Sequence, residues 1–179
     1  MKKSTILVLI LILGSSLLFS KVDLKSKEYD FGFTLGYWMS GDVDISGYTA
    51  EKDGSFLLRG FVDAYLIPKL AMGAFVNFAP ISQDGGEFKM FEFGCSIKPR
   101  FFINEDLAIK PGINFSYRTS SGDLEMDGLG INLSIEVQKA LETMILSFEG
   151  GFLSQPVGGD GWVDISWAPI MYIGAGLTF

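Results

Sequence analysis

Ten charged residues lie within stretches of alternating apolar and small residues, and they are the side chains most able to build a polar interior. Each falls on the less apolar face of its stretch, and the two signs are equal in number. They are Arg59, Asp63, Glu92, Lys98, Arg100, Lys110, Arg118, Glu136, Glu149 and Asp164. Buried charges persist only when they are paired. We therefore predict an ion-paired network that plugs an enclosed space, and the alternative is a selective channel lined by the same groups.

The residue types that catalysis most often uses are scarce. The chain has no histidine, which removes Ser–His–acid triads and most zinc sites. The single cysteine, Cys95, falls on an apolar face away from any base, so a thiol nucleophile is not expected. The segment Gly158–Gly161 lacks the strand and helix that flank a phosphate-binding loop. We predict no catalytic residues, no enzymatic activity and no cofactor.

Acidic residues gather in the four longer connections between the alternating stretches, with Lys52 as the one basic residue among them. They are Asp42, Asp44, Glu51, Asp53, Asp84, Glu87, Asp123, Glu125, Asp127 and Asp160. Asp123, Glu125 and Asp127 share one side of an extended segment and are a weak candidate for a divalent cation. Their spacing is not a full calcium-loop signature. We expect solvated connections and no metal site.

The alternation itself has a period of two, which is typical of β-strands. Eight such stretches cover approximately residues 29–40, 55–66, 70–79, 88–102, 107–119, 128–138, 143–153 and 163–179. Soluble strands usually have about five or six residues. Most of these stretches are longer and could cross a bilayer at a tilt.

The connections between the stretches alternate between long and short. In order they are Gly41–Asp53, Ile67–Lys69, Pro80–Glu87, Ile103–Asp106, Ser120–Asp127, Lys139–Glu142 and Ser154–Trp162. In an up-and-down meander all four long connections lie at one end. Outer-membrane barrels have this asymmetry, and a soluble sandwich has no reason to keep it.

The volume of a barrel decides which face points inward. The apolar faces supply about five large side chains per strand, whereas eight strands enclose a space that side chains only just fill. The apolar face is therefore predicted to point outward into lipid, unlike that of a lipocalin-like soluble barrel. Aromatic residues near the strand ends are expected to form interfacial girdles. These are Phe31, Tyr37, Phe101, Tyr117, Trp167 and Phe179.

The start of the chain has the layout of a secretory signal peptide. Lys2 and Lys3 precede the aliphatic run Ile6–Leu13, and small residues follow it. The apolar stretch is shorter than the roughly 20 residues of a membrane helix. We predict a signal peptide over residues 1–20, cleaved after Ser20, and one barrel domain over residues 21–179. That domain has 12 basic and 21 acidic residues, a formal charge of −9, which does not suit nucleic acid.

The last strand carries a resemblance to a known family. Its apolar face alternates with small residues, and the chain stops on Phe179. With the loop alternation and the signal-like start, the chain resembles the small eight-stranded outer-membrane barrels of the OmpA/OmpX type. The resemblance implies an all-β, antiparallel, up-and-down transmembrane β-barrel. It also implies that Tyr172, Leu177 and Phe179 form the signal that the barrel-insertion machinery recognises.

The same resemblance sets the functional expectations. We expect export through the Sec pathway to a bacterial outer membrane, where the protein is a monomer in lipid. The expected role is envelope-structural or surface-interacting, without an identified surface partner. A narrow porin-like channel for small solutes is the alternative.

Overall fold

The computed structural model describes residues 22–83, 86–123, 125–160 and 162–179. Within these ranges the regular elements are β-strands, and no helix is long and apolar enough to cross a membrane. The predicted signal peptide, residues 1–20, lies outside the described residues and stays a prediction.

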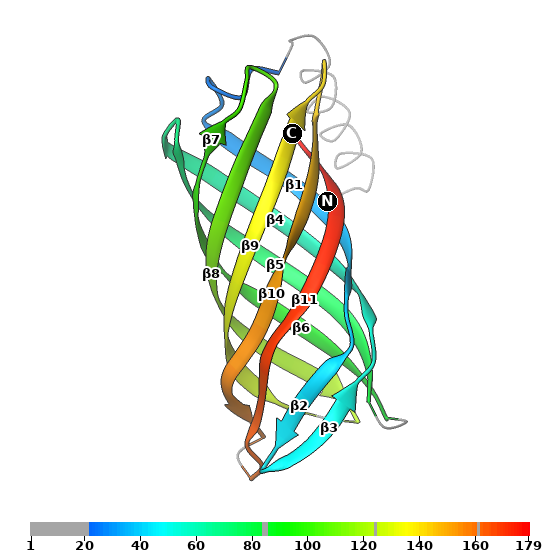
Figure 1. Cartoon of the computed structure of the whole chain (residues 1–179). Coiled ribbons are helices and arrows are strands. Elements are labelled where there is room, and N and C mark those ends of the chain that lie inside the picture. The colour runs from blue at the N-terminus through cyan, green and yellow to red at the C-terminus, as the bar shows by residue number, and fades with distance from the viewer. Residues whose placement is uncertain (1–21, 84–85, 124, 161) are drawn as a thin grey trace, which may run out of the picture.

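Eight long strands form a closed antiparallel barrel (Figure 1). Three short strands accompany them, namely β2 (Gly41–Ile45), β3 (Tyr48–Lys52) and β7 (Phe101–Phe102). The long strands are β1 (Tyr29–Trp38), β4 (Ser55–Ile67), β5 (Leu70–Gln83), β6 (Gly86–Pro99), β8 (Leu107–Gly122), β9 (Asp127–Ala140), β10 (Ile145–Gly159) and β11 (Ile165–Thr178). The barrel closes where β1 pairs with β11, from Gly32 opposite Thr178 to Trp38 opposite Tyr172. The predicted all-β, eight-stranded, up-and-down barrel is confirmed.

The two ends of the barrel differ. At the turn end, uppermost in Figure 1, short turns join β4 to β5 and β9 to β10, and both β1 and β11 have their outer ends there. At the hairpin end, β2 and β3 form a hairpin between β1 and β4, paired from Gly41 opposite Lys52 to Ile45 opposite Tyr48. Part of the segment 41–53, predicted as a connection, is therefore a β-hairpin.

Most of the long connections are shorter than the sequence indicated. Strands β5 and β6 continue to pair beyond the last apolar alternation, with Pro80 opposite Lys89 and Ser82 opposite Glu87. Strand β10 likewise runs on to Gly159. Neighbouring strands satisfy each other's backbone groups here, so the ladder persists where the outward side chains become polar. The apolar pattern marks the apolar belt of the barrel and not the ends of its strands.

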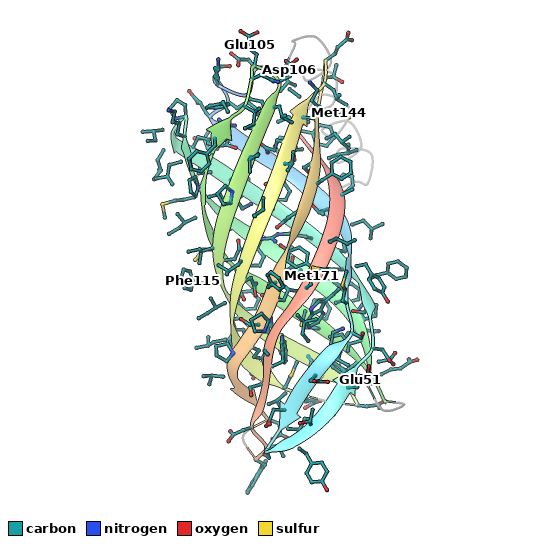
Figure 2. The ribbon with its side chains drawn as sticks, in the orientation of Figure 1. Glu51, Glu105, Asp106, Phe115, Met144 and Met171 are labelled. Carbon is teal, nitrogen blue, oxygen red and sulfur yellow. The ribbon has the colours of Figure 1, made fainter. Side chains whose placement is uncertain are left out.

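The outer wall is apolar and the interior is not. Leu133 is 53% exposed, whereas the adjacent Ser134 is 5% exposed. Large apolar side chains are exposed along all eight long strands, and Phe115 projects outward from β8 in Figure 2. The predicted facing of the apolar residues is confirmed.

Trp167 is the exception among the aromatic residues expected in the girdles. It is buried inside the barrel, at 5% exposure. Between the pairs Gln155–Trp167 and Leu153–Ile170, strand β11 has one residue more than β10. Such a β-bulge shifts the phase of the alternation. A strict alternation counted back from Phe179 would point Trp167 outward. The bulge next to Pro169 shifts the alternation by one residue, so Trp167 points inward.

Candidate functional site

The interior holds nine of the ten charged residues that were predicted to line it, all buried. The prediction for the tenth residue, Asp164, is wrong. Asp164 is exposed and precedes β11, and its backbone carbonyl accepts a hydrogen bond from the amide of Ser46. Asp30, fully buried, supplies the fifth carboxylate instead. Sequence reasoning missed it, although Asp30 shares the inward face of its strand with Thr34.

Lys110 of β8 is at the centre of the charges nearest the turn end. Its Nζ lies 3.2 Å from Asp30 Oδ2, 2.9 Å from Asp63 Oδ2 and 3.3 Å from Glu136 Oε2. Lys98 Nζ lies 3.0 Å from the same oxygen of Asp63. We call these five residues the Lys110 node. Three carboxylates share two ammonium groups, so each side chain depends on more than one partner.

Two further pairs lie towards the hairpin end. Arg59 Nη1 is 2.7 Å from Glu149 Oε1, and the hydroxyl of Tyr172 donates to that oxygen at 2.6 Å. Arg118 Nη2 is 2.9 Å from Glu92 Oε1. Glu92 also accepts hydrogen bonds from the amide groups of Asn77 and Asn132, at 2.6 and 2.7 Å. Charge-assisted hydrogen bonds of this kind are strong and position both partners.

Arg100 does not join this ion-pair network. Its Nε donates to the carbonyl oxygen of Pro68 at 3.1 Å, and its guanidinium carbon lies 3.6 Å from the centroid of the Tyr65 ring. Among the described residues, its two Nη atoms have no hydrogen-bond partner. Arg100 is held by a cation–π contact, so its predicted place in the ion-pair network is wrong.

An apolar layer closes the lumen at the hairpin end. We call it the hairpin-end cluster; its members include Trp38, Val43, Ile81, Phe88, Met90, Leu153, Ile165 and Trp167. The rings of Trp38 and Trp167 have their centroids 5.9 Å apart. A cavity of about 10 Å³ remains among these side chains, room for at most one water molecule.

The hairpin adds Lys52 to the hairpin-end cluster. Its Nζ lies 4.2 Å from the centroid of the Trp38 ring and donates to the carbonyl oxygen of Met39 at 2.9 Å and to that of Asp53. No carboxylate contacts it among the described residues, and burial lowers the pKa of Lys52 to about 8. Lys52 was predicted as part of a solvated connection, but it is buried.

A smaller apolar layer closes the turn end. This turn-end cluster consists of Leu24, Ala108, Ala140 and Ile145, with Val22 and Phe102 packed against it. Leu24 and Val22 precede β1, so part of the layer comes from outside the barrel strands. No periodic pattern in the sequence pointed to this segment.

The structure does not bring the side chains of the weak metal candidate together as a cation site. Asp123, Glu125 and Asp127 are exposed, and Asp123 Oδ2 accepts a hydrogen bond from the amide of Glu87 at 2.9 Å. In the described part of the chain, no three His, Cys, Asp or Glu side chains are grouped so that they could hold a metal ion.

The three residues predicted as an assembly signal do not share one face: Tyr172 and Leu177 lie on opposite faces of β11, and Phe179 follows its last residue. Tyr172 is buried in the lumen, whereas Leu177 is on the outer wall. Phe179 stacks on Phe31 with ring centroids 5.8 Å apart, and the two residues exchange backbone hydrogen bonds. These contacts tie the end of the chain to β1, while recognition by the insertion machinery stays a prediction.

The sequence matches no protein-family model and no curated protein. Solved structures match the fold. The outer membrane protein OprG from Pseudomonas aeruginosa superposes with a TM-score of 0.57 at 11% identity, covering 91% of this chain and 98% of that one. The chain has the fold of the small eight-stranded outer-membrane barrels.

Two further solved structures share this fold. Neisserial surface protein A has a TM-score of 0.60 at 14% identity, with 85% of this chain and 96% of that one covered. Ail, the attachment invasion locus protein of Yersinia pestis, has a TM-score of 0.51 at 13% identity, with 86% and 100% covered. The barrel architecture is thus shared at 11–14% sequence identity.

Proposed function

We propose that the protein is a non-conducting, non-enzymatic outer-membrane barrel with an envelope-structural or surface-interaction role. The observation that carries the proposal is a lumen filled along its length, by the turn-end cluster, the charged side chains and the hairpin-end cluster in turn. Eight strands leave little free space, and here packed or paired side chains occupy it.

The apolar wall supports a position in lipid. In water such a continuous exposed surface would promote aggregation. In a bilayer, a closed barrel satisfies its backbone hydrogen bonds internally while its apolar side chains face the acyl chains. We infer that the turn end faces the periplasm and the hairpin end faces outward. Export through the Sec pathway follows from the predicted signal peptide.

The hairpin end offers a surface for a partner. The hairpin joins the start of β11 through Ile45 opposite Ile165, and its tip is held by Ser46. Tyr48 is 83% exposed and Trp162 95% exposed on these adjoining segments. Aromatic side chains are enriched in protein interfaces, so a surface role would use this end. The names of two structural neighbours, a surface protein and an attachment protein, agree with such a role.

The buried carboxylates support a structural role in preference to catalysis. Each of the five has a basic side chain within 3.3 Å. A general base or nucleophile has to reach a substrate. These groups lie instead between two apolar layers that keep substrates away.

Conductance of the purified barrel in a planar bilayer tests the proposal. We expect no steady current from the wild type. Glu92→Ala should give brief openings and weaker folding because it leaves Arg118 without its carboxylate, whereas Glu125→Ala at an exposed position should change neither. Stable ion-selective currents from the wild type would overturn the proposal and establish the pore.

A further inference from the structure

The segment ahead of β1, residues 22–28, crosses the mouth of the barrel at the turn end. At one side the amide of Val22 donates to the carbonyl oxygen of Glu142, in the turn between β9 and β10, at 3.2 Å. At the other side the amide of Tyr65 on β4 donates to the carbonyl oxygen of Glu28 at 2.8 Å. We call residues 22–28 the strap. It is the blue segment at the top of Figure 1.

The strap places one apolar side chain inside the barrel. Leu24 is 0% exposed, while its neighbours Asp23 and Lys25 are exposed. It packs with Ala108 of β8, Ala140 of β9 and Ile145 of β10 in the turn-end cluster. Three neighbouring strands thus contact a single leucine at the mouth of the barrel.

The charged groups begin immediately behind this leucine. Side chains two residues apart in a strand share a face, so Lys110 follows Ala108 and Gln138 follows Ala140 going inward. Lys110 Nζ and Gln138 Nε2 both contact Asp30 Oδ2, at 3.2 and 3.0 Å. The Leu24 layer therefore separates the Lys110 node from the solvent at the turn end.

The strap is also linked to the node by charge. Lys27 Nζ lies 3.3 Å from Asp30 Oδ1. Among the described residues, this is the third polar contact between the strap and the barrel, after the backbone hydrogen bonds of Val22 and Glu28. The barrel strands, in contrast, are held by continuous ladders such as the one from Leu107–Lys139 to Thr119–Asp127. Segments with few backbone hydrogen bonds open at the lowest free energy.

We propose that the strap is a reversible stopper for the turn end of the lumen. Leu24 leaves its pocket while the barrel stays folded, and water then reaches the Lys110 node. The hairpin-end cluster stays closed throughout, so an open strap does not create a through-channel. The proposal concerns the barrel itself and holds whichever surface role the protein has.

Thiol accessibility in the refolded full-length barrel tests the stopper. In a Cys95→Ala background, Ala108→Cys places a thiol directly under Leu24, and Leu153→Cys places one in the hairpin-end cluster. The rate of reaction with N-ethylmaleimide is measured for each thiol with Leu24, with Leu24→Asp and with the milder Leu24→Ser. Lys25→Ser, at the exposed neighbouring position, is the matched control.

The stopper predicts a selective change. With Leu24 in place both thiols react slowly. Leu24→Asp should accelerate labelling at position 108 by at least about tenfold, because the protected state is lost locally, with Leu24→Ser intermediate and Lys25→Ser unchanged. Labelling at position 153 should not change.

Three results would overturn the proposal. Fast labelling at position 108 with the strap intact would mean that Leu24 does not seal the mouth. An unchanged rate in both Leu24 variants would mean the same. Acceleration at positions 108 and 153 together would make Leu24 a determinant of the whole barrel and not a local stopper.

Discussion

The outer wall and the lumen of this barrel are built from the same eight strands but follow different rules. The wall repeats one kind of residue at every second position, as around Leu133. The lumen changes character along its length, from the turn-end cluster through three groups of ion pairs to the hairpin-end cluster. Fluid lipid accepts any apolar shape, whereas a narrow interior has to pair most of its polar groups and fill its volume. Substitutions should therefore be judged by chemical class on the wall and by individual contacts in the lumen.

The largest effect is expected at the centre of the Lys110 node. Lys110→Met leaves Asp30 and Glu136 without their nearest common cation. Removing one partner from a buried ion pair costs about 3–5 kcal/mol, and the free energy of unfolding should fall by that order. Urea titration of barrels refolded in detergent or lipid measures the change.

Arg100→Met is the matched control inside the lumen. It removes a buried cation that has a ring partner and no carboxylate, so the loss should be nearer the ~0.5–2 kcal/mol of a cation–π contact. Equal losses for Lys110→Met and Arg100→Met would show that the node's specific pairs do not matter. The difference between lumen and wall would then reduce to burial alone.

On the wall, a substitution should change the stability of the barrel through its charge and not through its shape. Leu133→Lys places an ammonium group on the apolar belt and should destabilise the barrel by about 2–4 kcal/mol when it is refolded into bilayers. Leu133→Ile keeps the apolar class and should change little. Ser134→Lys, on the lumen side, should be milder than Leu133→Lys if the interior pairs or solvates the charge. If Leu133→Lys were the mildest of the three, the wall would not face lipid.

The same contrast explains what could be predicted from the sequence. Which side chains point outward and which point into the lumen follows from alternation alone, because the exposure of every residue from Leu129 to Val137 alternates with a period of two. Trp167 was placed on the wrong side because one extra residue in β11 reverses the phase. A bulge is a property of the pairing between two strands, and neither strand shows it by itself.

The lumen was predictable in composition but not in arrangement. Period two placed nine charged residues inside, yet it did not say that Lys110 would meet three carboxylates while Arg100 met none. These contacts depend on the register and tilt of strands that are distant in the chain. Leu24 was missed for a related reason, since the strap is irregular and its pocket exists only once β8, β9 and β10 are side by side.

The smallest predicted effect concerns pH at Lys52, which lies where the lumen meets the outside. Burial lowers the pKa of Lys52 from 10.5 to about 8 in the folded protein. Between these values the folded state has released a proton that the unfolded chain still binds, so stability from this group rises with pH across that window. Below about pH 8 both states are protonated, and Lys52 contributes no pH dependence there.

Urea midpoints measured from pH 7 to 10 should therefore rise more in the wild type than in Lys52→Met, with Lys69→Met, on an exposed turn, behaving like the wild type. Identical pH profiles for the wild type and Lys52→Met would mean that Lys52 is solvated, and that the hairpin does not bury it against the hairpin-end cluster.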